Sequence, residues 1–258
     1  MMAAHEQTYS DIHHAARQLQ TPVIGDVFAQ LADQAREENW THEEYLAGVL
    51  ERQVGVRSAN SVKARTTAAR FPTIKTLEDF DHSAISPKAR DMVAHLATGV
   101  FVTRADNVIW LGPPGVGKTH LAIALGHIVC AQGSRVIFDS AAGWVNQLAD
   151  AHSQGRLNAE LKRLDRYRLL IVDELGYLPL TAEAAALFFQ LIAHRYEKSA
   201  IMITSNLAFS RWGETLGDEA VATATIDRLV HHAHVITIDA ESYRTRHHRK
   251  ANTNKQDK

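Results

Sequence analysis

The sequence predicts an α/β fold in which a parallel sheet of five strands is covered by helices on both faces and is preceded by a small all-helical domain. Three observations lead to this prediction. The chain of 258 residues is 45% hydrophobic and 22% charged, a composition that supports a sizeable core. Short apolar runs rich in strand-forming residues occur at 108–111, 136–138, 169–172, 201–204 and 235–238. Stretches with helical spacing separate these runs, and that alternation builds a parallel sheet.

The all-helical domain is predicted over residues 1–70. From about residue 11 to residue 51, apolar residues recur at three- and four-residue spacing among polar ones. Thr41 is followed three residues later by Glu44, which is the spacing of a capping box and predicts that a second helix begins there. A basic segment without a single acidic residue comes next, and its members are Arg52, Arg57, Lys63, Arg65, Arg70 and Lys75.

The overall charge points to no class of partner. Lys and Arg total 28 against 29 for Asp and Glu, so any surface for nucleic acid or membrane has to be local. The single cysteine, Cys130, lies among apolar residues, which fits an inert thiol in a reducing compartment. The first residues lack the pattern of a signal peptide, and no run approaches the ~20 apolar residues that span a bilayer. We therefore expect a soluble cytoplasmic protein.

A phosphate-binding loop follows the first apolar run. Residues 112–119 fit the pattern of a glycine, four variable residues and then Gly-Lys-Ser/Thr, between a predicted strand and a predicted helix. The pattern alone arises by chance in about one chain of this length in a hundred, and the flanking strand and helix make chance much rarer. It predicts that ATP is bound by Gly112, Pro113, Pro114, Gly115, Val116, Gly117, Lys118, Thr119 and the adjacent His120.

The residue types in this loop match the chemistry of a bound triphosphate. Glycines let backbone N–H groups turn inward around the phosphates, and the amino end of the following helix favours the same anions. We expect Lys118 to reach the β- and γ-phosphates and the Thr119 hydroxyl to be a ligand of Mg²⁺.

Two acidic residues, Asp173 and Glu174, end the apolar run 169–172. The carboxyl edge of an open α/β sheet is where ligands bind. We expect Asp173 to hold Mg²⁺ through water, and Glu174 to orient and deprotonate the water that attacks the γ-phosphate. Acidic residues after a strand often only begin a turn, but the phosphate-binding loop one strand upstream favours the catalytic interpretation.

Polar side chains also end the run 201–204. If this strand inserts between the strand of the phosphate-binding loop and the strand of the acidic pair, Asn206, or Thr204 behind it, could bond the γ-phosphate or the attacking water. The alternative is that Ser205 and Asn206 simply form a turn.

With these motifs placed, a family resemblance becomes visible. The residues that carry it are 44–46, 50–51, 75–81, 107, 112–125, 172–177, 195–196, 204–207, 227–229 and 242–244. Through them the chain resembles the IstB-like helper ATPases of insertion-sequence transposition, relatives of the DnaC helicase loaders in the AAA+ superfamily. The basic cluster is thinner here than in those relatives.

The resemblance implies a fold and further site residues. It implies a small N-terminal helical domain, an AAA+ core over residues 71–246 with sheet order 5-1-4-3-2 and no C-terminal lid, and a polar, disordered tail over 247–258. ATP would lie between subunits of a homo-oligomer, with Arg228 as an arginine finger acting on the neighbouring subunit and Arg244 as a second arginine sensor. From the residues alone, the preferred interpretation of Arg228 is a helix-end cation or an ion pair near Asp227.

The resemblance also implies a function. The chain would be an ATPase that assembles on double-stranded target DNA, presents it to a partner transposase of the IstA type, and disassembles on hydrolysis. DNA phosphates would be contacted by Lys63, Arg65 and Arg70. The alternative is a helicase loader that uses ATP as a switch.

The histidines suggest a metal site that we do not predict. Fifteen are present, including adjacent pairs at 13–14, 231–232 and 247–248. Adjacent histidines point in different directions on a helix, and no cysteine or carboxylate spacing completes a ligand set.

Overall fold

The computed structural model describes residues 2–177 and 179–239, with side chains from residue 6 onward. The chain divides into two compact units, Met1–Ala64 and Arg65–Lys258. In the described residues, no helix has both the length and the apolar character needed to cross a bilayer.

The first unit is built from helices α1 (Met2–Gln18), α2 (Pro22–Glu37) and the first part of α3 (His42–Ala68). Phe28 is buried at its centre, with the ring of Tyr9 packed edge-on at 4.9 Å and the hydroxyl of Tyr45 donating to its carbonyl at 3.0 Å. The predicted capping box is confirmed, because the Thr41 amide donates to the Glu44 carboxylate at 2.7 Å and the Glu44 amide donates to the Thr41 hydroxyl at 3.2 Å. The Glu44 carboxylate also accepts from the Thr41 hydroxyl at 3.0 Å, and the bonds from the Thr41 amide and hydroxyl lower the pKa of Glu44.

The second unit contains a parallel sheet of five strands in the order β2-β3-β4-β1-β5. Its strands are β1 (Asn107–Leu111), β2 (Val136–Ser140), β3 (Leu169–Leu175), β4 (Ala200–Ser205) and β5 (Ala233–Thr237). All five predicted strands are present, and the predicted order 5-1-4-3-2 is the same order read from the other side. The fifth begins two residues earlier than predicted.

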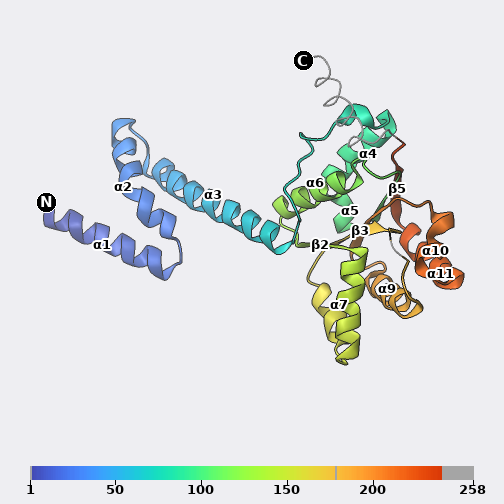
Figure 1. The fold of residues 1–258 in the computed structure, drawn as a ribbon. Coiled ribbons are helices and arrows are strands. Elements are labelled where there is room, and N and C mark those ends of the chain that lie inside the picture. Colours follow the sequence, from blue (N-terminus) through green and yellow to red (C-terminus); the bar gives the residue numbers. More distant parts are fainter. Residues whose placement is uncertain (1, 178, 240–258) are drawn as a thin grey trace, which may run out of the picture. The chain divides into compact units, whose positions relative to one another are not determined.

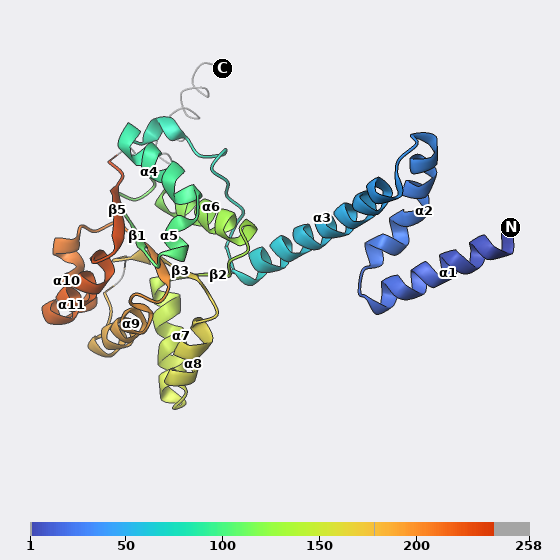
Figure 2. The same cartoon turned by 180° about the vertical axis from the view of Figure 1, so that it is seen from behind.

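Helices cover both faces of this sheet (Figures 1 and 2). They are α4 (Pro87–Ala97), α5 (Val100–Thr103), α6 (Lys118–Ala131), α7 (Ala141–Ser153), α8 (Leu157–Leu164), α9 (Ala182–Arg195), α10 (Trp212–Leu216) and α11 (Glu219–Val230), with short 3-10 turns at His82–Ala84 and Phe209–Arg211. Strand β1 is buried along its whole length, and its side chains contribute to two hydrophobic cores. Trp110 belongs to the core that includes α4, α5 and α6, and Ile109 belongs to the core that includes α7 and α9.

The last turn of α3 belongs to the second unit. The side chain of Arg65 donates from Nε to the carbonyl of Cys130 at 2.8 Å, and the carbonyl of Ala69 accepts from the Phe138 amide at 2.9 Å. Burial raises the pKa of the Cys130 thiol, as suits an unreactive thiol. The division between the two units therefore falls inside α3, at Arg65.

A buried arginine fastens the amino edge of the sheet. Arg195 is fully buried at the end of α9, and its guanidinium donates to the carbonyls of Leu164, Tyr167 and Ala200 at 3.0, 2.9 and 3.3 Å. Burial lowers its pKa to about 10, so it remains cationic at neutral pH. Three carbonyl dipoles stabilise the buried charge. Through these bonds the Arg195 guanidinium connects α8 and the segment after it to the first residue of β4.

Candidate active site

The phosphate-binding loop joins the carboxyl end of β1 to the amino end of α6. All three of its glycines have positive φ, and two of them lie against other parts of the chain. A Cβ at Gly112, φ 148°, would lie 2.2 Å from the carbonyl oxygen of Ile238, and one at Gly117, φ 95°, would lie 2.6 Å from the ring of Phe80. Only glycine fits both positions, so the loop geometry depends on the two residues packed behind it.

Lys118 is held inside this loop. Its side chain is buried, and Nζ donates to the carbonyls of Gly112 and Pro113 at 2.7 and 2.8 Å. These bonds place an ammonium group against the loop whose backbone N–H groups are predicted to surround the phosphates. A compact cation in this position can neutralise phosphate charge.

A hydroxyl and a carboxylate meet directly after the lysine. The Thr119 hydroxyl donates to the Oδ1 atom of Asp173 at 2.8 Å, and the Thr204 hydroxyl donates to the same atom at 2.5 Å. Asp173 is only 6% exposed. A carboxylate beside a hydroxyl is an oxygen donor set of the kind Mg²⁺ prefers, and Mg²⁺ sites with one or two protein ligands keep several waters. The residues present therefore fit the ion that the sequence predicts.

Glu174 has a backbone conformation that sets it apart from its neighbours on β3. Its φ is 60°, in the left-handed region that glycine favours, and the pairing of β3 with β4 shifts register between Val172 and Leu175. Such an interruption re-aims side chains, and the strained conformation is typical of functional positions. The Glu174 side chain is exposed and borders a small cavity of about 80 Å³. The acidic pair lies within β3, and a turn also begins at Glu174, whose carbonyl accepts from the Tyr177 amide at 3.3 Å, so the two interpretations are compatible.

Strand β4 lies between β1 and β3, which confirms the predicted insertion. The Thr204 hydroxyl donates to Asp173 and accepts from the Glu174 amide at 2.9 Å. Thr204 therefore orients the acidic pair, and its hydroxyl is already engaged there instead of facing a phosphate.

Asn206 follows the same strand and is half-buried. Its Oδ1 atom would lie 3.3 Å from a Cβ at Gly176, two residues beyond Glu174. The turn is formed by its neighbour, because the Ser205 hydroxyl accepts from the Leu207 amide at 3.1 Å. Asn206 is thus placed beside the acidic segment, while Ser205 supplies the turn chemistry.

A cavity of about 470 Å³ opens beside the phosphate-binding loop. One wall is the loop itself with His120, and the other is the segment 72–84, which the sequence interpretation did not assign to the site. The His120 ring nitrogen Nε2 bonds the carbonyl of Thr76 at 2.7 Å, and the Phe80 ring lies edge-on to His120 at 5.4 Å. Nothing local in residues 72–84 predicts this position, because it depends on contacts with a loop about forty residues later.

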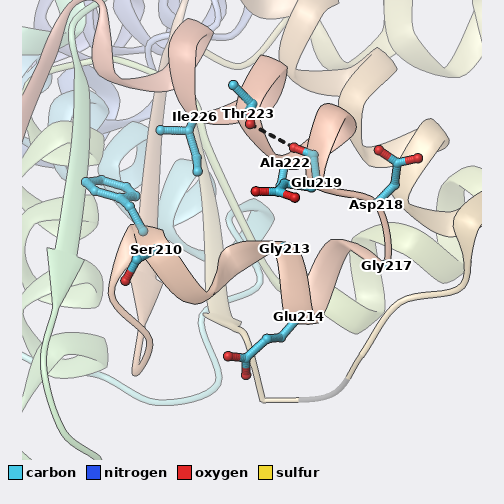
Figure 3. Close-up of a pocket in the computed structure, with 10 residues that line it drawn as sticks. Ser210, Gly213, Glu214, Gly217, Asp218, Glu219, Ala222, Thr223 and Ile226 are labelled. Atoms are coloured by element: carbon cyan, nitrogen blue, oxygen red, sulfur yellow. Dashed lines mark hydrogen bonds between the residues drawn. The ribbon is translucent and has the colours of Figure 1, made fainter.

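A second cavity, of about 570 Å³, lies between α10 and α11 (Figure 3). Three acidic residues line it: Glu214, Asp218 and Glu219. Carboxylates repel a polyphosphate, and this cavity has no phosphate-binding loop. Its greater volume therefore does not make it the nucleotide site.

Arg228 lies away from the other predicted catalytic residues. It stands in the last turn of α11, with Nη1 donating to the Ala224 carbonyl at 3.1 Å and the guanidinium 4.8 Å from the centre of the Phe189 ring. Helix α11 leads into the amino end of β5, whereas Lys118 and Glu174 lie at the carboxyl edge. The other predicted arginine, Arg244, lies outside the described residues.

The predicted DNA-contacting residues differ in their surroundings. Lys63 and Arg70 are exposed, whereas Arg65 is half-buried and bonds the Cys130 carbonyl. Lys63 and Arg70 therefore offer more accessible charge than Arg65 does.

Comparison with known proteins identifies the family. Residues 14–251 match the family model described as IstB-like ATP binding protein. The chain is 44% identical to an ATP-binding protein assigned to insertion sequence IS21 of Pseudomonas aeruginosa, over 86% of this chain and 83% of that protein. It is 38% identical to the corresponding protein of IS5376 from Geobacillus stearothermophilus, over 92% and 95%.

Solved structures show the same fold at lower identity. The DnaC helicase loader matches 67% of this chain and 98% of its own, with a TM-score of 0.52 and 23% identity. DnaA from Aquifex aeolicus matches 65% and 50%, with a TM-score of 0.53 and 21% identity. The second unit thus has the AAA+ fold of these replication proteins, and the chain belongs to the family of IstB-like ATP-binding proteins associated with insertion sequences.

Proposed function

We propose that this chain hydrolyses ATP and uses the cycle of binding and hydrolysis to assemble on, and release, target DNA for a partner transposase. The observation that carries the proposal is the network at the carboxyl edge of the sheet, in which Thr119 and Thr204 both donate to Asp173. Membership in a family of ATP-binding proteins supports the nucleotide.

Each residue of the network has a separate task in the proposed reaction. Lys118 binds the phosphates and offsets the charge that develops on the γ-phosphate. Thr119 and Asp173 hold Mg²⁺, which when bound neutralises phosphate charge. Glu174 takes a proton from the attacking water, and Thr204 fixes Glu174 through its backbone amide. Asn206 is placed to bond the same water or the γ-phosphate.

The base and sugar of ATP would occupy the cavity walled by residues 72–84. Phe80 presents an aromatic edge there, and the half-apolar surroundings suit a purine better than the acidic cavity between α10 and α11 does. The contact between His120 and Thr76 keeps this wall beside the phosphate-binding loop.

The transposition role rests on the relatives, whose names place them in insertion sequences. We propose that Arg228 completes the nucleotide site of a neighbouring subunit, that Arg244 senses the γ-phosphate, and that Lys63, Arg65 and Arg70 contact DNA phosphates. A DnaC-like loader remains the alternative, but similarity to the loader at 23% identity supports only the shared fold.

The decisive experiment measures hydrolysis and binding separately. For Glu174→Gln we expect phosphate release to fall by about 10²-fold or more while ATP affinity stays within about threefold, because the amide cannot accept the proton. Glu183→Gln, in the exposed first turn of α9, is the matched control and should behave as wild type. Near-normal turnover of Glu174→Gln would remove the proposed mechanism.

The same variant tests assembly. With ATP and duplex DNA, Glu174→Gln should accumulate large DNA-bound oligomers, measured by sedimentation or electron microscopy, because hydrolysis no longer releases them. If it stays monomeric under these conditions, the assembly role is wrong even if the ATPase role stands.

A further inference from the structure

Three potential metal ligands gather at the amino edge of the sheet, away from the nucleotide site. Glu197 stands between α9 and β4, and His231 and His232 stand between α11 and β5. Their ligand atoms all lie within 4.8 Å of one another. In the described part of the chain this is the one such group of three. Sequence spacing gave no sign of this carboxylate, because Glu197 precedes His231 by 34 residues.

The distances within this group suit a bound ion better than direct hydrogen bonds. Glu197 Oε1 lies 3.8 Å from His231 Nδ1 and 3.6 Å from His232 Nε2. A tetrahedral ion with bonds of about 2.0–2.1 Å places its ligand atoms about 3.3–3.4 Å apart. A contraction of a few tenths of an ångström would bring the two carboxylate–imidazole distances to that geometry. About half of each side chain is exposed, so solvent ions can reach the group.

The backbone around the group is already fixed. Buried Asn107, the first residue of β1, donates from Nδ2 to the Leu229 carbonyl at 3.0 Å and accepts from the Ile201 amide at 2.9 Å. Its own amide donates to the carbonyl of His232 at 2.6 Å. The segments that carry Glu197 and the two histidines are thus held beside β1 without any ion, and little ordering is required on binding.

One further side chain contacts a ring nitrogen of His231. The Tyr196 hydroxyl lies 3.0 Å from His231 Nδ1, the nitrogen that faces Glu197. A tyrosine hydroxyl is a hydrogen-bond donor at neutral pH and can donate to this nitrogen. With Tyr196 as donor, Nδ1 carries the lone pair that a metal ion requires, and the ion would displace this hydrogen bond.

We propose that Glu197, His231 and His232 form a binding site for a divalent transition-metal ion of the zinc class, with water completing the coordination. Two imidazoles and one carboxylate favour zinc over Mg²⁺ or Ca²⁺, which prefer oxygen ligands alone. The ion would fasten the end of α11 to the segment between α9 and β4. Because α11 carries Arg228 three residues before His231, the ion would also limit the motion of that arginine.

The test uses the full chain with excess Mg²⁺ present, so that oxygen sites are occupied. Titration with Co²⁺, followed by its visible absorption, should show one ion per chain in a low-symmetry nitrogen and oxygen environment, and Zn²⁺ should displace it. Replacing Glu197 with Gln or either histidine with Asn should weaken binding at least tenfold. His194→Asn is the matched control, because His194 faces the single carboxylate of Asp165, and it should bind as wild type.

A second measurement reports on the fold instead of affinity. Zn²⁺ should slow amide hydrogen exchange in residues 196–200 and 230–233 together, in the wild type and not in the His232→Asn variant. The proposal is overturned if the wild type binds no ion at 100 µM Zn²⁺, or if the three variants bind as tightly as the wild type, which would place the ion elsewhere.

Discussion

The two edges of the sheet both bury polar side chains, but they use them differently. At the carboxyl edge, Asp173 accepts from the hydroxyls of Thr119 and Thr204, and Thr204 also accepts from the Glu174 amide, beside the proposed substrate. At the amino edge, Asn107 and Arg195 bond backbone groups of neighbouring elements. The buried polar residues at the carboxyl edge therefore surround the proposed substrate, whereas those at the amino edge connect neighbouring elements of the chain.

Arg228 lies toward the amino edge of the sheet, on the opposite side from the acidic pair. Helix α11 carries it toward the amino edge, where it rests on Phe189, so it stands away from the acidic pair of its own chain. If it acts on a phosphate, that phosphate belongs to a neighbouring subunit. Three predictions test this division between the edges.

The largest effect is expected at Arg228. Arg228→Ala should lower hydrolysis by about 10³-fold with ATP affinity retained, since an arginine finger stabilises charge only in the transition state. Mixing this variant with Glu174→Gln should restore activity, because each supplies what the other lacks at a shared interface. Arg211→Ala, which removes an exposed cation paired with Glu214, is the control. Failure of the mixture to recover any turnover would argue against action between subunits.

A smaller effect is expected at Thr204. Thr204→Val keeps the shape but removes the bonds to Asp173 and to the Glu174 amide. A hydrogen bond to a charged group contributes about 1.5–3 kcal/mol, so turnover should fall about 10- to 100-fold. Thr204→Ser retains the hydroxyl and should recover most of the rate. Equal rates for the two variants would show that the hydroxyl is dispensable.

The smallest effect on chemistry is expected at Asn107. Asn107→Ala leaves the Leu229 carbonyl and the Ile201 amide without their partner, which should cost about 1–3 kcal/mol in the free energy of unfolding. Turnover per folded molecule should change less than twofold. Denaturant unfolding and phosphate release separate the two quantities, and exposed Asn158→Ala serves as the control. A large loss of turnover without a loss of stability would contradict the assignment of Asn107 to a purely structural role.

Local patterns predicted much of this molecule. The five strands, the phosphate-binding loop and the capping box at Thr41 each depend on residues a few positions apart, and the structure contains all of them. The helix through the basic segment was not predicted: α3 continues to Ala68, although residues 52–68 carry no clear apolar stripe. Its last turn instead lies in the second unit, where Arg65 bonds the carbonyl of Cys130.

Contacts across long sequence separations were beyond local patterns. Phe80 reaches Gly117 because segment 72–84 crosses the loop, and Thr204 reaches Asp173 because β4 inserts beside β3. Glu197 meets His231 because β4 and β5 flank β1 on either side. The last two contacts depend on strand order, which the sequence suggested only through its resemblance to a family.

The chain leaving β5 passes directly behind the first residue of the phosphate-binding loop. The Ile238 amide donates to Leu111 at 2.8 Å, and its carbonyl occupies the space that a side chain at position 112 would need. Position 112 therefore cannot carry a side chain while the backbone at residue 238 follows this path, whichever side chain residue 238 carries. An insertion, deletion or bulky label directly after β5 should displace Gly112 and thereby change nucleotide affinity. This effect requires no contact between the Ile238 side chain and a phosphate.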